Sequence, residues 1–209
     1  MPSKDFSWYV SWWLRRRRFA LFQSIVAPID KPIRVLDVGG SEEYWEQMDF
    51  ISPDVINLTI LNLEAHTSAR ANVHFVIGDA RRLPFGGHAF DIVFSNAVLE
   101  HVGSEDDQSA AAAEIARVGR HLLVMVPNRY WPIEVHTLLP FYQFWPRWLQ
   151  HGVLGRTWKL THFRDAGHAR RVMDSVRLPS MIDMRRWFPT ASYRKERILG
   201  ISKTLIAYC

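Results

Sequence analysis

Three acidic residues lie in or directly after short apolar runs, and they carry the clearest chemical signal in this sequence. Asp37 lies near the end of the run 33–38, and Glu64 and Asp79 each follow a later run. Such runs are typical of buried parallel strands, and ligands bind beyond the carboxyl ends of these strands. A carboxylate at Glu64 can accept both hydroxyls of a ribose, and one at Asp79 can accept from an adenine amino group. The three acids therefore predict a nucleoside site at one edge of a parallel sheet.

The turn after the first apolar run distinguishes between two kinds of nucleoside ligand. Gly39 and Gly40 lack a Cβ, so the backbone there can approach a ligand closely. A dinucleotide site needs G-x-G-x-x-G, so that N–H groups at a helix start meet the pyrophosphate. Here the third glycine is missing, and Glu42 and Glu43 stand where phosphate needs positive potential. A positively charged nucleoside without phosphate fits better, and S-adenosylmethionine is such a ligand.

Four stretches of the sequence resemble the successive motifs of class I S-adenosylmethionine-dependent methyltransferases. They are Val-Leu-Asp-Val-Gly-Gly at 35–40, Leu-Asn-Leu-Glu at 61–64, the run 78–85 from Gly-Asp-Ala to Pro-Phe, and the run 90–101 from Phe-Asp-Ile to Glu-His. The subgroup that they resemble best is the methyltransferase type 11 enzymes of bacteria, and the similarity covers about residues 33–127. The resemblance implies a Rossmann-like, doubly wound α/β sheet of about seven strands whose last strand is antiparallel.

The resemblance also implies which residues bind the cofactor. Together with their neighbours in the same turns, the matching positions give this predicted set: Asp37, Gly39, Gly40, Ser41, Asn62, Leu63, Glu64, Asp79, Ala80, Arg81, Ser95, Asn96 and Ala97. The family's usual Asp-x-Gly-x-Gly-x-Gly is replaced by Asp-Val-Gly-Gly-Ser-Glu-Glu at 37–43, which leaves the contacts to the methionine end open. The spacing from Asp37 to Glu64 is longer than usual, so Asn62 is an alternative ribose-facing residue.

The acceptor of the methyl group is less well defined by the sequence. Methyl transfer from a sulfonium is an in-line displacement, and a general base helps when the acceptor is a hydroxyl. The fourth run ends in Ser-Asn-Ala-Val at 95–98, without the Asn/Asp-Pro-Pro-aromatic stretch of the resembling N-methylating enzymes. An oxygen acceptor is therefore favoured, on a small molecule, a saccharide or a lipid-linked intermediate, with nitrogen and carbon acceptors left open.

Three residues are candidates for catalysis. His101 comes just after the fourth run, and Glu134 and His136 could act as a base and its orienting partner. The structural alternatives are that His101 caps a turn and that the Glu134–His136 pair only pins a loop. Arg129 and His162 are weaker candidates, and we assign no metal ligands.

The elements that would position these residues follow from the pattern of apolar runs and breaks. We expect strands at 33–38, 55–63, 73–77, 90–94 and 121–126, helices at 41–50, 106–119 and 179–188, and a final hairpin of 193–199 and 202–208. The segment from 64 to 72 is polar and short, so any second crossover helix there should be reduced. Alternating strands and helices predict a parallel sheet, in a single domain spanning 31–209.

Residues 128–178 lack a clear period and are rich in aromatic side chains. We expect an insertion that lies over the strand ends and carries this cluster: Tyr130, Trp131, Phe141, Tyr142, Phe144, Trp145 and Trp148. The cluster could stack against an acceptor ring. The favoured interpretation is that it forms the core of the insertion.

Residues 1–30 form a leader with a predicted helix from about 11 to 26 that contains Arg15–Arg18. We favour a helix packed on the domain with its arginines reaching water, over a contact of 12–26 with anionic lipid or a phosphorylated substrate. No run is long enough to span a bilayer. A lone cysteine, Cys209, favours a reducing compartment, and we expect a cytoplasmic protein, membrane-peripheral if the leader contacts lipid.

The net charge of the whole chain bears on its partners. It is +5 for 209 residues, which is too mild to require nucleic acid. We expect no DNA partner and disfavour RNA, although an RNA methyltransferase and a cofactor-binding protein without turnover remain the alternative functions. The sequence leaves the oligomeric state open.

Overall fold

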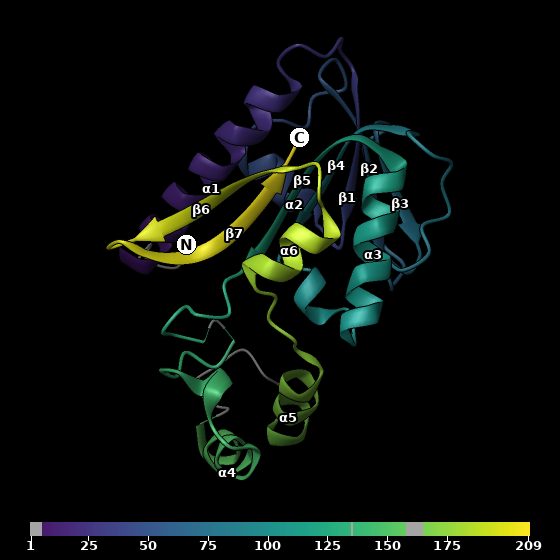
Figure 1. Ribbon diagram of the computed structural model, residues 1–209. Coiled ribbons are helices and arrows are strands. Elements are labelled where there is room, and N and C mark those ends of the chain that lie inside the picture. Colours follow the sequence, from purple (N-terminus) through teal and green to yellow (C-terminus); the bar gives the residue numbers. More distant parts are fainter. Residues whose placement is uncertain (1–5, 135, 158–164) are drawn as a thin grey trace.

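The computed structural model describes residues 6–134, 136–157 and 165–209, and a single sheet of seven strands forms its centre (Figure 1). The strands lie in the order β3-β2-β1-β4-β5-β7-β6. Their bounds are Ile33–Val38 (β1), Ile56–Asn62 (β2), Val73–Ile77 (β3), Phe90–Asn96 (β4), Gly119–Pro127 (β5), Ser192–Ile198 (β6) and Ile201–Tyr208 (β7). The expected sheet of about seven strands is confirmed.

The direction of the strands follows from how they are connected. Strands β1 to β5 pair in parallel, whereas β7 pairs antiparallel with both β5 and β6. The parallel strands are covered on both faces, which is why they read as almost continuous apolar runs. β7 follows β6 through the two-residue turn Leu199–Gly200, and so tight a connection requires antiparallel neighbours. The expected antiparallel last strand is therefore confirmed.

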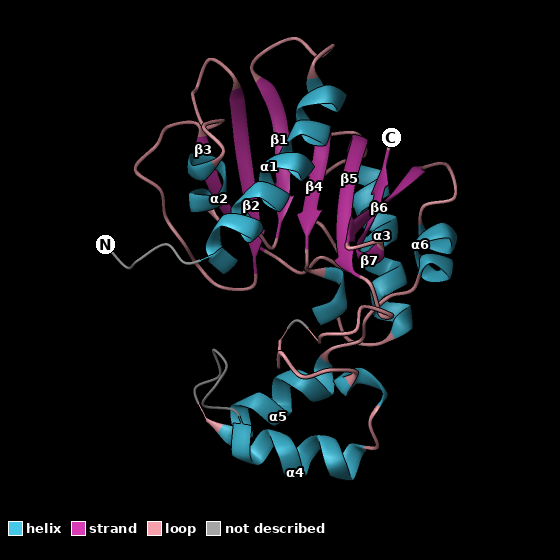
Figure 2. Cartoon of the chain, turned by 90° about the vertical axis from the view of Figure 1, so that its left-hand side faces the viewer, coloured by secondary structure: helices cyan, strands magenta, loops and turns pink. Residues whose placement is uncertain are grey.

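Helices cover the two faces of the sheet in separate layers. α1 (Phe6–Val26) and α2 (Glu42–Gln47) lie on one face, and α3 (Glu105–Val118) and α6 (Met181–Trp187) lie on the other (Figures 1 and 2). Each layer has its own buried core, one around Phe22 and Trp45 and one around Ile115 and Met184. Among the described residues no helix connects β2 to β3, as expected from the short polar segment there.

The leader forms a helix that is an integral part of one of these layers. Leu14, Phe19 and Phe22 of α1 are buried, while the neighbouring arginines Arg15–Arg17 are exposed. Arg18 is partly buried, and its guanidinium reaches Glu196 on β6 at 3.6 Å. These contacts confirm the packed helix. The helix begins at Phe6 rather than near residue 11, because Trp8, Tyr9 and Val10 give no local break that would stop it earlier.

The insertion after β5 lies beyond the carboxyl ends of the parallel strands, as predicted (Figure 2). Its described elements are η2 (Tyr142–Phe144), α4 (Arg147–Thr157) and α5 (Ala166–Ser175). The expectation that its aromatic cluster forms a core is wrong for most of the cluster. Only Tyr142 is fully buried, whereas Tyr130, Phe141, Phe144 and Trp148 are exposed.

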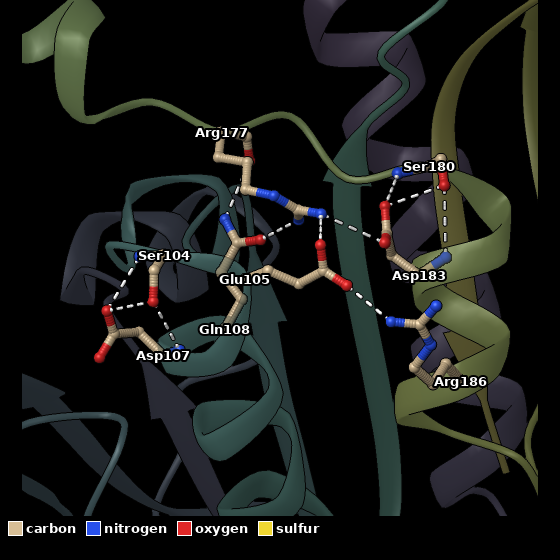
Figure 3. Close-up of polar contacts among 8 residues, drawn as sticks. All are labelled: Ser104, Glu105, Asp107, Gln108, Arg177, Ser180, Asp183 and Arg186. Atoms are coloured by element: carbon tan, nitrogen blue, oxygen red, sulfur yellow. Dashed lines mark hydrogen bonds and ion pairs between the residues drawn. The ribbon is translucent and has the colours of Figure 1, made fainter.

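A polar network attaches the end of the insertion to α3. Arg177 donates to the side chains of Gln108 (2.6 Å) and Glu105 (2.7 Å), and Gln108 Nε2 donates back to the Arg177 carbonyl at 2.9 Å (Figure 3). Capping boxes at Ser104 and Ser180 fix the adjacent ends of α3 and α6. The Arg177 N–H also donates to the Glu100 carbonyl at 2.9 Å. The network therefore holds the insertion against η1 (Leu99–His101), the short turn after β4.

No helix among the described residues combines the length and the apolar character needed to cross a membrane.

Candidate active site

A cavity of about 740 Å³ opens at the carboxyl ends of β1, β2 and β3. Eight residues of the predicted cofactor set line it: Gly39, Gly40, Asn62, Leu63, Glu64, Asp79, Ala80 and Arg81. His101, from the predicted catalytic set, lines it too, together with His66 and Val98. The parallel strands bring these residues together because their carboxyl ends meet at one edge of the sheet.

The two glycines of the first turn are required by close packing. Gly39 has φ +73°, and a Cβ there would lie 2.7 Å from a Val98 methyl group. A Cβ on Gly40 would lie 1.8 Å from the Asp37 carboxylate. Asn62 Nδ2 donates to the Gly40 carbonyl at 3.0 Å, so this amide holds the turn from the neighbouring strand. The turn is thereby kept narrow and leaves the cavity open.

The acids after β2 and β3 differ in how they are engaged. Glu64 is exposed at the cavity, and its carboxylate makes no hydrogen bond or ion pair with any residue in the described part of the chain. Asp79 accepts from the Arg81 guanidinium at 2.6 Å and from its backbone N–H at 2.9 Å. These bonds hold the pKa of Asp79 below its ordinary value. Arg81 also reaches Asp107 at 2.8 Å. Among Asn62, Glu64 and Asp79, Glu64 is thus the residue whose side chain is free for a ligand, because the amide of Asn62 and the carboxylate of Asp79 already have partners.

Asp37 is placed behind the cavity. Its side chain is 1% exposed, and Trp45 Nε1 of α2 donates to its Oδ2 at 2.8 Å. Its Oδ1 has no hydrogen-bond partner among the described residues. Burial raises the pKa of Asp37 to about 7, with the Trp45 bond acting in the opposite direction. The residue therefore links the glycine turn to the aromatic core beneath α1 and α2.

Four further residues of the predicted cofactor set lie outside the cavity lining. Ser41 is exposed next to α2, and Ser95 is buried with its hydroxyl lacking a partner in the described ranges. Asn96 and Ala97 line a separate hollow against α1, where Asn96 Oδ1 accepts from Arg18 at 3.4 Å. The end of β4 thus turns toward the leader helix, a contact that local sequence patterns cannot reveal.

The predicted catalytic residues come together although 35 positions separate His101 from His136. His136 Nδ1 lies 2.7 Å from Glu134 Oε1, and His136 Nε2 lies 3.3 Å from His101 Nε2. Glu134 Oε2 accepts the backbone N–H groups of His136 (2.9 Å) and Thr137 (2.7 Å). Glu134 is 1% exposed, so its carboxylate is held rigidly inside the base of the insertion.

Burial and neighbouring charges shift the pKa values of Glu134, His136 and His101. Burial would lower the pKa of His136, but the bond to Glu134 and the nearby carboxylates outweigh it and raise the pKa. Desolvation lowers the pKa of His101 to about 4, and the adjacent His136 adds to this effect. For Glu134, the bond to His136 outweighs burial and lowers the pKa. His136 and Glu134 thus form a polarised pair that points toward His101.

Glu100 belongs to this cluster and was not predicted. Its side chain is 0% exposed, and neither carboxylate oxygen has a partner among the described residues. Burial raises its pKa to about 7. The sequence contained one signal, the position of this acid beside a candidate histidine, but nothing local showed that its side chain turns inward.

A second cavity, of about 430 Å³, lies within the insertion and reaches Gly103 after η1. Its lining includes Glu134, Arg129 and Gln143, and it shares Gly103 and Ser175 with the first cavity. The Glu134–His136–His101 chain therefore runs from one cavity to the other. Of the weaker candidates, Arg129 lines this second cavity, and His162 lies outside the described residues.

The antiparallel β7 between β5 and β6 in a seven-stranded sheet, the glycine turn and the cavity at the strand ends define the class I S-adenosylmethionine-dependent methyltransferase fold. Comparison with known families agrees, since residues 37–122 match the model Methyltransf_11, described as a methyltransferase domain. This segment of the chain is similar to that family, in agreement with the sequence motifs. No curated protein gives a significant match to the chain.

Solved structures with the same fold share little sequence with this chain. A Burkholderia thailandensis 1,6-didemethyltoxoflavin-N1-methyltransferase, solved with its substrate and S-adenosylhomocysteine, has a TM-score of 0.57 at 16% identity, covering 93% of this chain and 76% of that one. Magnesium protoporphyrin IX methyltransferase from Synechocystis PCC 6803, with S-adenosylhomocysteine, has a TM-score of 0.53 at 13% identity, covering 93% and 82%. The YcgJ protein of Bacillus subtilis has a TM-score of 0.53 at 20% identity, covering 87% and 70%. These similarities show the fold alone.

Proposed function

We propose that this protein transfers the methyl group of S-adenosylmethionine to an oxygen atom of a small molecule, a saccharide or a lipid-linked acceptor. The observation that carries the proposal is the arrangement of two adjoining cavities with the Glu134–His136–His101 chain between them. The matched methyltransferase domain supports the reaction class, and the solved relatives bound to S-adenosylhomocysteine support the cofactor.

The residues around the first cavity fit the cofactor. Glu64 offers a free carboxylate after β2, which suits the two hydroxyls of a ribose. Gly39 and Gly40 line the cavity in a tight turn that has no room for a Cβ, and Asp79 lies where an adenine amino group would need an acceptor. When bound, S-adenosylmethionine supplies an electrophilic methyl carbon whose bond to sulfur breaks as the bond to the acceptor forms. Leu63, Ala80 and Arg81 complete the proposed binding set on the cavity side.

The chain's own groups would position the acceptor and take its proton. Arg129 and Arg147 line the second cavity and can donate hydrogen bonds to a hydroxylated or anionic acceptor. Gln143 Oε1, which has no partner among the described residues, can accept a hydrogen bond from an acceptor hydroxyl. His136 Nε2 faces His101 at the boundary of the two cavities, and Glu134 fixes the orientation of the His136 ring. A site enclosed by the insertion would hold the two reactants close and limit water.

Cofactor binding tests the first part of this proposal. We expect Glu64→Ala and Asp79→Ala each to weaken S-adenosylhomocysteine binding by about 1–3 kcal/mol, roughly 5- to 150-fold, because each strands polar partners of the ligand. Titration calorimetry on the purified proteins measures this. Asp54→Ala is the control, because Asp54 is exposed before β2, at the opposite end of that strand from Glu64. Unchanged affinity in both variants would remove the assigned pocket, and a wild-type protein that binds nothing would overturn the cofactor.

Turnover separates an enzyme from a binding protein that has lost it. The alternative is a protein that binds the cofactor without transferring its methyl group, and the glycines missing from the turn at 40–43 motivate it. A methyl-transfer assay against fractionated small molecules, saccharides, lipids and RNA measures it. We expect transfer to a hydroxyl-bearing fraction. Transfer confined to RNA would favour the alternative acceptor, and binding without transfer to any fraction would favour the pseudo-enzyme.

We also propose that one face of the protein contacts an anionic membrane. This basic face consists of Arg16 and Arg17 on α1 and Arg194, Lys195 and Arg197 on β6, all of which are exposed. Arg17 and the three residues of β6 line one shallow hollow with Arg18 and Glu196, so basic residues of the two elements outnumber the one acidic residue there. The exposed Leu199, at the tip of the hairpin, adds an apolar contact. Such a combination suits anionic headgroups.

A further inference from the structure

The side chain of Glu100 is the least explained polar group in the described part of the chain. It is 0% exposed, and both of its carboxylate oxygens lack a hydrogen-bond partner among the described residues. Its backbone is fixed, since the Arg177 N–H donates to its carbonyl at 2.9 Å. A buried, unpaired carboxylate costs several kcal/mol unless a cation or a proton compensates it. We therefore expect a cation or a proton beside the Glu100 carboxylate.

The imidazole rings of His101 and His136 lie next to this carboxylate, at distances close to those of ligands on one metal ion. One potential ligand atom each from Glu100, His101 and His136 lie within 4.8 Å of one another. The two histidine Nε2 atoms are 3.3 Å apart. Two nitrogen ligands of one tetrahedral zinc ion, each about 2.0–2.1 Å from it, are about 3.3–3.4 Å apart.

The surroundings of His136 are those of a metal-binding histidine. Its Nδ1 lies 2.7 Å from Glu134 Oε1, and Glu134 is fixed in turn by the backbone N–H groups of His136 and Thr137. A histidine whose Nδ1–H is donated to a carboxylate presents an unprotonated Nε2 in a set direction, and metal-binding histidines generally have such an outer partner. Glu134 thus orients His136 toward His101.

We propose that Glu100, His101 and His136 bind one divalent first-row transition-metal ion at the junction of the two cavities. Two imidazoles with one carboxylate favour an ion such as Zn²⁺, Fe²⁺ or Co²⁺ over Mg²⁺ or Ca²⁺, which prefer oxygen ligands. Three protein ligands leave at least one coordination position open. The ligand atoms must draw together slightly to close around the ion, because opposite ligands are at most about 4.2 Å apart.

The inferred ion deepens the proposed function and, in its catalytic part, rests on it. An acceptor hydroxyl bound at the open position would lose its proton to water more readily, and its oxygen would then be the nucleophile. In the protein without the ion, His136 Nε2 is the proton acceptor. With the ion bound, His136 is a ligand and Glu134 a positioning residue.

Metal binding can be measured without turnover. Tag-free full-length protein is freed of metal with a chelator and titrated with Co²⁺, whose visible absorption reports its ligands, and with Zn²⁺ by calorimetry. We expect one ion per chain. Glu100→Gln, His101→Asn and His136→Asn should each weaken binding at least tenfold, and Glu134→Gln roughly 10- to 100-fold through the orientation of His136. His74→Asn, at an exposed histidine on β3, is the matched control and should bind normally.

Two outcomes would overturn the metal site. One is the absence of stoichiometric binding to the wild-type protein. The other is binding that the three ligand variants and His74→Asn retain equally. Circular dichroism establishes that each variant is folded, and if one unfolds, the wild-type Co²⁺ spectrum still decides, because a ligand set with nitrogen from histidine differs from that of aqueous Co²⁺. S-adenosylhomocysteine binding to the metal-free protein is measured in parallel. Its loss would count against the proposed function, and its retention without metal binding would count against the ion alone.

Discussion

At the scale of single residues, Asp37 shows how a motif position can serve the fold. The carboxylate lies between Trp45 Nε1 and the space where a Gly40 side chain would be. It is therefore held away from the cavity and inside the protein. A carboxylic acid in this position prefers to be neutral, because charge is costly in an apolar interior.

Asp37 should make the stability of the protein depend on pH. Its pKa is raised to about 7 in the folded protein, against an ordinary value of 3.8. Between these values the folded state keeps a proton that the unfolded chain has lost, so the free energy of unfolding falls as pH rises through this window. Asp37→Asn removes this loss. We expect the variant to match wild type near pH 4 and to exceed it by about 1–3 kcal/mol at pH 8.

Urea unfolding at a series of pH values measures this difference. Subtracting the wild-type curve from that of the variant cancels the other titrating groups, including Glu100. Asp54→Asn, at an exposed position, should run parallel to wild type at every pH. A parallel curve for Asp37→Asn as well would show that Asp37 is charged at neutral pH.

At the scale of elements, α1 is the helix whose role was hardest to foresee. Phe22 is 0% exposed and contacts Trp45, Phe50 and Phe94 at ring-centroid distances of 5.2, 5.6 and 5.9 Å. These partners come from α2, the segment after it and β4. The helix is therefore part of the core that supports the glycine turn.

Removing one ring from this core tests the role of α1. We expect Phe22→Ala to lower the free energy of unfolding by about 3–5 kcal/mol, since the cavity left behind adds to the lost burial. Chemical denaturation measures it. Gln23→Ala, the adjacent exposed position, should change it by less than about 0.5 kcal/mol. A small effect of Phe22→Ala would mean that the stability of the sheet does not depend on the packing of α1.

The strands were predictable within a few residues because each is a continuous apolar run between polar breaks. β3 matches its predicted bounds, and β1 does as well. α2 was predicted too long, at 41–50 rather than Glu42–Gln47, since its residues after Gln47 continue an apparently helical pattern while the chain already turns at Asp49 (φ 55°). The inward turn of Glu100 and the contact of Asn96 with Arg18 depend on tertiary packing. Neither could be read from local spacing.

At the scale of the whole molecule, the modest net charge of +5 is less informative than its distribution. The basic face lies on α1 and β6, which are side by side, whereas the insertion lies beyond the carboxyl ends of the parallel strands (Figure 1). The first cavity opens at the carboxyl ends of β1 to β3, and the second lies in the insertion. If the basic face contacts a membrane, neither cavity opens toward the lipid, because neither is lined by the residues of that face.

Vesicle binding tests the proposed basic face. We expect the protein to sediment with vesicles that contain phosphatidylserine and not with phosphatidylcholine alone, and the binding should weaken as salt is raised. Arg194→Ala with Arg197→Ala should weaken it by about 1 kcal/mol per residue, roughly fivefold each. Arg120→Ala, at an exposed arginine near the start of β5, should leave it unchanged. Equal binding by all three proteins would indicate a non-specific charge effect.

The chain enters the insertion after β5 and leaves it before α6, and at both points it is hydrogen-bonded to elements outside the insertion. Asn128 donates its backbone N–H to the Lys203 carbonyl (2.8 Å) and its Nδ2 to the Ser202 carbonyl (2.8 Å) on β7, and Arg177 donates to Gln108 on α3. The lobe between these two anchors carries Glu134 and His136 and nearly all of the second cavity, whereas most residues that line the first cavity lie outside it. Changes of sequence within the lobe should therefore alter the acceptor side of the protein while the strands beneath the first cavity keep their positions.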